Sequence, residues 1–194
     1  MEQDYKNEKI KYSNENCSFE NLYVSLIFHQ IFQFLDKDSR KCLSLCNKKI
    51  YQLYKDQVKE LKIKSGTKIS KVLALIDKYK NVNILNLSDC RNIKDFTPIS
   101  KIERLEMLDV RDTNICDISF LEKNNNIKEL RLYGCENIKD FSTISKLEKL
   151  ESFDVGYTNI SDISFLEKNK IIKDLNLLYC ENIKDFIPIS KIER

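Results

Sequence analysis

The sequence is poor in the residues from which most catalytic and metal sites are built. It contains one histidine, His29, no tryptophan, three glycines and two prolines among its 194 residues. Neither a Cys-x-x-Cys pair nor a phosphate-binding loop occurs, so a zinc site or a Cys–His nucleophile has almost nothing to be built from. We therefore expect no enzyme activity, no metal and no cofactor.

Charge and hydropathy exclude further classes of partner. The chain has 33 lysines and arginines and 30 aspartates and glutamates, a net charge of +3, which argues against nucleic acid or a membrane as the partner. No apolar run approaches the roughly 20 residues of a transmembrane helix. The mixed-charge start, Met1–Glu8, lacks the pattern of a secretory signal. Seven cysteines without such a signal indicate reduced thiols, so we expect a cytoplasmic or nuclear protein.

An internal repeat occupies residues 82–194. Segment Asn92–Arg104 recurs at Asn137–Lys146 and Asn182–Arg194, every 45 residues. Each period holds two shorter units of 22 or 23 residues, and all units open with one apolar frame. The five units begin at Val82, Leu105, Ile127, Leu150 and Ile172. The frame ends on alternating cysteine and threonine, namely Cys90, Thr113, Cys135, Thr158 and Cys180. Such periodicity is the signature of a repeat architecture.

The frame, for example Val82-x-x-Leu85-x-Leu87-x-x-Cys90, resembles the leucine-rich repeat. The resemblance implies an α/β fold, a solenoid with a curved parallel sheet and short turns or 3₁₀ pieces outside. The physics agrees, because one short strand cannot bury its apolar face until neighbouring units stack on it. We predict five leucine-rich repeats in 82–194. Residues 58–81 carry a helical pattern over Lys68–Lys80 and predict an atypical first repeat.

Two recurrent positions are interpreted as scaffold. An aspartate precedes an apolar residue in every unit and is a natural cap for a short outer turn. These aspartates are Asp95, Asp117, Asp140, Asp162 and Asp185. The frame cysteines lie two units apart, about 10 Å for strands spaced ~4.8 Å, which is too far for a disulfide. We therefore expect buried, reduced cysteines.

Candidate partner-binding residues lie beside the leucines, on the predicted concave face, where the units vary. They are Asn86, Ser88, Asp109, Arg111, Arg131, Tyr133, Asp154 and Asn176. Asp109, Arg131 and Asp154 would stand side by side with alternating charge. Two compatible interpretations stay open: a cross-strand charge ladder worth ~0.5 kcal/mol per exposed pair, and a mixed polar face with Tyr133 as an aromatic anchor.

The N-terminal region has a different pattern. Residues 1–20 are polar and without period, and we interpret them as a flexible tail. A helix over Leu22–Leu35 would show only a narrow polar stripe that includes Gln33, so two surfaces must bury it. A second helix is predicted from Arg40 to about Tyr54, after residues 36–39, whose side chains can cap it.

The run Ile27–Asp36, followed by Leu43–Lys49, resembles an F-box. The resemblance implies that residues 21–57 form a three-helix module that docks on Skp1, the adaptor of cullin-based ubiquitin ligases. The side chains that it would place against a Skp1-like adaptor are Ile27, Phe28, Ile31, Phe32, Phe34 and Leu35.

Together these patterns predict a protein–protein interaction adaptor that is monomeric outside its complex. The function that the F-box resemblance implies is substrate recognition in a Skp1-cullin-F-box (SCF) ubiquitin ligase, with the substrate protein held by the repeats. The alternative is a stand-alone leucine-rich-repeat binding module whose N-terminal helices only cap the array.

Overall fold

The computed structural model describes residues 35–36, 38–40, 52, 55–56, 58–169 and 171–191. The chain divides into two compact units, Met1–Tyr51 and Gln52–Arg194. The predicted tail and most of the predicted adaptor contacts (Ile27, Phe28, Ile31, Phe32 and Phe34) lie outside the described residues. Leu35 alone of those contacts is described, and it is half-buried.

A short capped turn is described in the N-terminal unit. The Asp36 carboxylate accepts hydrogen bonds from the backbone N–H of Asp38 at 3.0 Å and of Ser39 at 2.8 Å. The N–H and the hydroxyl of Ser39 lower the pKa of Asp36 below its usual value. Residues 38–40 are helical, so helical structure precedes the predicted start at Arg40.

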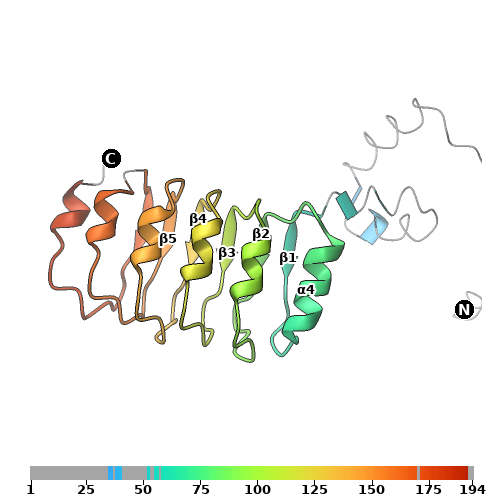
Figure 1. Ribbon diagram of the computed structural model, residues 1–194, viewed down its shortest axis with the longest axis horizontal. Coiled ribbons are helices and arrows are strands. Elements are labelled where there is room, and N and C mark those ends of the chain that lie inside the picture. The colour runs from blue at the N-terminus through green and yellow to red at the C-terminus, as the bar shows by residue number, and fades with distance from the viewer. Residues whose placement is uncertain are drawn as a thin grey trace, which may run out of the picture. The chain divides into compact units, whose positions relative to one another are not determined.

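The C-terminal unit is a stack of strand–turn repeats (Figure 1). Six parallel strands form one sheet in sequence order, and each is followed on the outer side by a helical turn. The strands are β1 (Glu60–Lys62), β2 (Ile84–Asn86), β3 (Met107–Asp109), β4 (Glu129–Arg131), β5 (Ser152–Asp154) and β6 (Asp174–Asn176). The outer elements are α4 (Ile69–Lys78) and the 3₁₀ helices η1 (Thr97–Lys101), η2 (Ser119–Lys123), η3 (Ser142–Lys146), η4 (Ser164–Glu167) and η5 (Ile187–Lys191).

Strand register follows the apolar frame without slippage. Leu85 pairs with Leu108, then come Leu130, Phe153 and Leu175 in successive strands. Both leucines of the first L-x-L pair, Leu85 and Leu87, are fully buried, and the residue between them is half-exposed. Alternation along each strand therefore places one column of frame residues in the core and the columns beside it on the other face of the sheet.

The first unit differs from the others, because its outer element is an α-helix. Helix α4 spans ten residues, against the prediction of Lys68–Lys80. Val72 is fully buried, and Ile69, Leu75 and Ile76 pack against the core at spacings of three and four residues. No helix in the described part of the chain is long and apolar enough to cross a membrane.

The recurrent aspartates cap the outer turns. Asp95 Oδ1 accepts hydrogen bonds from the N–H of Thr97 at 2.9 Å and from its hydroxyl at 2.6 Å. The other four aspartates accept the same backbone N–H, two residues ahead. The Thr97 hydroxyl and N–H lower the pKa of Asp95. Each aspartate precedes the residue at the helix boundary, so it closes an Asx turn that leads into the 3₁₀ helix.

The 45-residue period has a structural cause in two alternating ways of bonding to the preceding unit. In one type of unit, Cys135 Sγ lies 3.1 Å from the carbonyl oxygen of Val110, which also accepts the Thr113 hydroxyl at 2.7 Å. In the other type, Asn124 Nδ2 donates to the carbonyl oxygen of Ile102 at 2.8 Å. Cys180 with Thr158, and Asn169, repeat this arrangement one period later. The frame cysteines Cys90, Cys135 and Cys180 are buried and free, as expected.

A buried amide tests how much of this polar bonding the core requires. Asn124 is fully buried, its Oδ1 has no hydrogen-bond partner within the described residues, and Ile102 and Leu147 occupy its place in the adjacent units. We expect Asn124→Leu to change the free energy of unfolding by less than about 1 kcal/mol, because a lost hydrogen bond is offset by removal of the unpaired oxygen. Asn124→Asp should cost roughly 3 kcal/mol or more, because it buries an unpaired carboxylate facing a carbonyl oxygen.

Urea denaturation of the two variants, followed by circular dichroism, measures both values. Equal losses of stability in the two variants would contradict this account of the core.

Candidate protein-binding face

The outward residues of the strands form the exposed sheet face, the surface predicted to be concave. Register places Asn86, Asp109, Arg131, Asp154 and Asn176 in one column across neighbouring strands, as the repeat frame predicted. Every residue of this column except Asp109 is half-exposed. The next column along the strands holds Ser88, Arg111, Tyr133, Gly156 and Leu178.

Asp109 is the centre of an ionic network. It is fully buried, although its position in the strand points away from the core. Its two oxygens accept hydrogen bonds from Arg111 Nε at 2.9 Å and Arg111 Nη2 at 2.8 Å, a bidentate pair. Arg111 thus covers the carboxylate, and the hydrogen bonds from the guanidinium to Asp109 raise the pKa of Arg111. Asp109 positions Arg111, and it has no surface of its own for a partner.

Arg131 makes its main contact within its own strand. Its guanidinium pairs with Glu129, while its nearest nitrogen lies 3.9 Å from Asp109 Oδ2. No ion pair joins Arg131 to Asp154 in the described part of the chain. The alternating ladder of Asp109, Arg131 and Asp154 expected from the sequence therefore does not form as a continuous row.

The amides and acids of the central column also end the strands. Asn86, Asp109, Asp154 and Asn176 each accept the backbone N–H two residues ahead, at 2.9–3.3 Å. Asn176 Nδ2 donates to Asp154 Oδ1 at 2.9 Å, and Asn86 Nδ2 donates to Asp109 Oδ2 at 3.3 Å. Most of their polar groups form hydrogen bonds inside the repeat, so the side chains of this column are held in fixed positions on the exposed sheet face.

The turn after each of the strands β2 to β6 bends through one residue of positive φ. In successive units this residue is Asp89, Asp112, Gly134, Tyr157 and Tyr179, with φ between 53° and 71°. Aspartate and glycine adopt such a conformation readily, whereas a bulky side chain does so at a cost of roughly 1–3 kcal/mol. Two consecutive tyrosines in this conformation are therefore strained positions, and strain of this kind is concentrated at functional sites.

These tyrosines join Tyr133 in an aromatic patch, defined as Tyr133, Tyr157, Leu178 and Tyr179. The ring centroids of Tyr133 and Tyr157 are 5.1 Å apart, and those of Tyr157 and Tyr179 are 4.4 Å apart. Leu178 is 52% exposed and Tyr179 is 57% exposed. Partial burial, followed by the Tyr179 hydroxyl, raises the pKa of Tyr157. The patch is a continuous apolar and aromatic surface at the end of the sheet face where β4, β5 and β6 finish.

Gly156 makes room for this arrangement. A side-chain carbon at that position would lie 3.0 Å from Tyr133 Cδ2, 3.1 Å from the Leu178 carbonyl oxygen and 3.3 Å from Asn176 Nδ2. The Tyr133 ring can therefore lie close over the backbone of the next unit only because residue 156 has no side chain.

Sequence reasoning named Tyr133 as an aromatic anchor and did not name Tyr157 or Tyr179. A signal for the two other tyrosines was present, since they break a column that elsewhere contains aspartate or glycine. Their proximity to Tyr133 was not readable, because it depends on the direction in which each turn leaves its strand.

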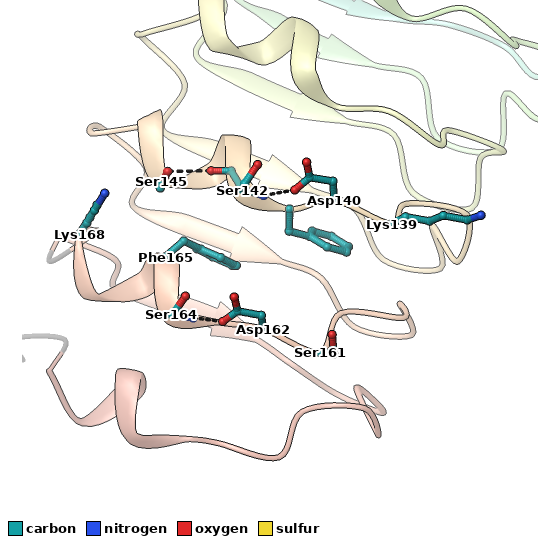
Figure 2. Close-up of a pocket in the computed structure, with 10 residues that line it drawn as sticks. Lys139, Asp140, Ser142, Ser145, Ser161, Asp162, Ser164, Phe165 and Lys168 are labelled. Atoms are coloured by element: carbon teal, nitrogen blue, oxygen red, sulfur yellow. Dashed lines mark hydrogen bonds between the residues drawn. The ribbon is translucent and has the colours of Figure 1, made fainter.

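A hollow lies on the outer side of the array, between η3 and η4 (Figure 2). It has a volume of about 400 Å³ and includes Asp140, Asp162, Lys139 and Lys168. Both carboxylates are turned onto the N–H groups of Ser142 and Ser164 as caps. The N–H and hydroxyl of Ser142 lower the pKa of Asp140. This hollow is explained by turn capping and points to no ligand.

Potential metal ligands and thiols occur within the part of the chain that the structure describes. The described ranges contain no cluster of three or more histidine, cysteine, aspartate or glutamate side chains that could hold a metal ion. Burial raises the pKa values of the Cys90 and Cys135 thiols, which makes each a weak nucleophile. Among the described residues, the aromatic patch is the surface best suited to contact another molecule.

Replacing a strained tyrosine separates a role in stability from a role in binding. Asparagine accepts positive φ, so we expect Tyr157→Asn to change the free energy of unfolding by less than about 1 kcal/mol, because relief of strain offsets the lost ring contacts. Tyr157→Val should lose more stability, since a β-branched residue is poorly accommodated there. Thermal melting of both variants measures this, and an equal loss would indicate that the ring serves the fold.

Comparison with known proteins places the repeats among solved structures. No protein-family model matches the chain, and no curated protein does. An internalin (inlF) from Listeria monocytogenes is similar with a TM-score of 0.62 and 28% identity, over 73% of this chain and 40% of the internalin chain. Internalin C2 (inlC2) from the same organism gives 0.61 and 26%, over 71% and 59%. This chain thus spans 40–59% of the length of these two structures.

The similarity lends no support to an F-box in residues 21–57. Together with the six-stranded parallel sheet, it confirms the fold predicted from the frame. The chain contains a leucine-rich-repeat solenoid.

Proposed function

We propose that the exposed sheet face binds a protein partner, with the aromatic patch as its anchor. The observation that carries this proposal is the contact of three tyrosines at the end of the sheet, two of them in a strained backbone conformation. Tyrosine is enriched among the residues that contribute most to protein interfaces, because a ring buries a large area with few rotatable bonds.

The scaffold below the patch supports this role. The central column is held by hydrogen bonds within and between units, and Arg111 is fixed on a buried carboxylate. Binding on such a surface orders few additional side chains, so less of the interaction free energy is lost on association. The similarity to internalins supports a repeat module as the type of protein. The position of the binding surface is proposed from the residues of the exposed sheet face alone.

The proposal extends to the rest of the chain as follows. Residues 21–57 hold a Skp1-like adaptor and the repeats hold the protein to be modified, which makes the chain a substrate-recruiting subunit of an SCF-type ubiquitin ligase. The support is the sequence run Ile27–Asp36 with Leu43–Lys49. The alternative is a stand-alone repeat module, and the internalin similarity supports a repeat module of this kind.

Loss of the two strained tyrosines should weaken partner binding without unfolding the protein. We expect the full chain carrying Tyr157→Asn and Tyr179→Asn to capture its partner from cell extract with at least ~10-fold lower yield, since anchor residues commonly contribute 2 kcal/mol or more. Phe186→Asn is the matched control, because Phe186 is 55% exposed, like Tyr179 at 57%, but precedes the outer turn η5. Capture that depends on Phe186 and not on the tyrosines would refute the proposed face.

The adaptor role has its own test. Wild-type full chain is expected to co-purify with Skp1, and Ile31→Asp is expected to lose it, because a carboxylate cannot be buried in an apolar interface without a partner. Gln33→Asp is the control, since Gln33 lies on the predicted polar stripe of the same helix. Absence of Skp1 from the wild-type preparation would favour the stand-alone module.

A further inference from the structure

A hollow of about 450 Å³ adjoins the aromatic patch, and its chemistry indicates what kind of side chain the partner inserts there. It is lined by Tyr133 and Tyr157 from the patch and by the carboxylates Asp112 and Glu136, together with Arg91 and neighbouring polar residues. Two aromatic rings and two carboxylates thus border one open space on the side of the patch nearest β3 and β4.

The hollow depends on Gly134. A side-chain carbon there would lie 2.6 Å from Asp112 Oδ1, so the carboxylate occupies the volume that any other residue would fill. Gly134 also has φ of 71°, and its N–H donates to the Gly156 carbonyl oxygen at 3.0 Å. The N–H of Asp112 donates to the Tyr133 carbonyl oxygen at 2.9 Å, so backbone bonding between the two turns holds Asp112 next to Tyr133.

The charges around the hollow are unevenly satisfied. On the exposed sheet face Arg111 is paired with Asp109 and Arg131 with Glu129, so both guanidinium groups already have a carboxylate partner. Asp112 and Glu136 form no ion pair in the described part of the chain, and neither do Asp154 and Asp174 on the sheet. The chain as a whole carries +3, yet the two carboxylates that line the hollow have no ion-pair partner among the described residues. Arg111 attracts Asp112 without forming an ion pair with it, since the pKa of Arg111 is raised first by the hydrogen bonds to Asp109 and also by the charges of Asp154 and Asp112.

Arg91 is the one cationic side chain that lines the hollow. Its Nε donates to the backbone carbonyl oxygen of Asp112 at 3.2 Å, which holds the guanidinium stem at the edge. With two carboxylates against one arginine, the hollow is net negative and a second cation is favoured there. Tyrosine faces add attraction for a cation, and Arg is the side chain most often found over them.

We infer that the hollow receives a lysine or arginine side chain from a basic, partly apolar segment of the protein partner, whose neighbouring apolar residue packs on Leu178 and Tyr179. The inference rests on the proposed function, because it names the chemistry of the partner at the same face. An acidic segment is disfavoured, since it would face unpaired carboxylates across arginines that are already paired.

A displayed library of random nine-residue peptides, panned on the full chain, provides the probe. Enriched peptides are expected to carry arginine or lysine beside an apolar residue. The leading peptide is then synthesised and its Kd measured by fluorescence anisotropy at low and high salt. We expect Asp112→Asn with Glu136→Gln to weaken binding by roughly 5- to 30-fold and to flatten the salt dependence. Asparagine is tolerated at the positive φ of residue 112, so this variant keeps the turn.

Variants at other positions separate the two ideas. Tyr157→Asn with Tyr179→Asn should weaken the same peptide, and Phe186→Asn should leave its Kd unchanged. Binding that needs the tyrosines but ignores Asp112 and Glu136 would overturn the basic-segment inference and leave the proposed face standing. Binding that ignores the tyrosines as well would overturn both. Enrichment of acidic peptides, or of no peptide, would overturn the inference.

Discussion

The lateral pairing of very short parallel strands is the interaction on which the rest of the structure depends. Each strand has three residues and by itself buries almost nothing. Backbone bonds extend the pairing beyond the strand ends, for example where the Asn83 carbonyl oxygen accepts the N–H groups of both Glu106 and Met107. Leu85, Leu108, Leu130 and Phe153 then stack into one continuous core column. Because each unit is held mainly by its neighbours, the outer turns are free to be short 3₁₀ pieces with a single aspartate cap.

This arrangement divides the polar residues into two groups. Asparagines and aspartates that bridge units or close turns form their hydrogen bonds within the array, as the amide nitrogen of Asn124 and the carboxylate of Asp95 illustrate. Asp109 belongs to the same group, although it lies on the sheet face, since it is buried under Arg111. The carboxylates of Asp112 and Glu136 form no such hydrogen bond or ion pair within the described residues. These two negative charges therefore lie on the surface next to the aromatic patch and do not take part in holding the units together.

Backbone strain is a separate observation at the aromatic patch. Aspartate and glycine adopt the positive φ of this turn with little strain, but the last two units have tyrosine at this position. Stability alone would favour the residues found in the earlier units. The Tyr157 ring contacts the rings of both Tyr133 and Tyr179, and exposed apolar area surrounds them. Contact with a partner would offset the free-energy cost of the strained backbone. The strain, the exposed apolar area and the unpaired carboxylates are independent observations that meet on the adjacent turns after β3, β4, β5 and β6.

The repeat frame determined the fold by itself, because residues spaced at two and three positions and repeated every 22 or 23 residues allow one way of burying every leucine. It also determined the strand register, the aspartate caps and the reduced, buried state of Cys90, Cys135 and Cys180. Only the tertiary structure decided which polar residues form their hydrogen bonds and ion pairs inside the array. Asp109 and Arg111 are two positions apart in the sequence, and nothing in that spacing says that the arginine folds back over the acid. Tyr157 and Tyr179 are 22 residues apart and come into contact because stacked turns leave their strands in the same direction. Side-chain direction at a turn is set by the φ of one residue and by the neighbouring unit, and neither can be read from the frame.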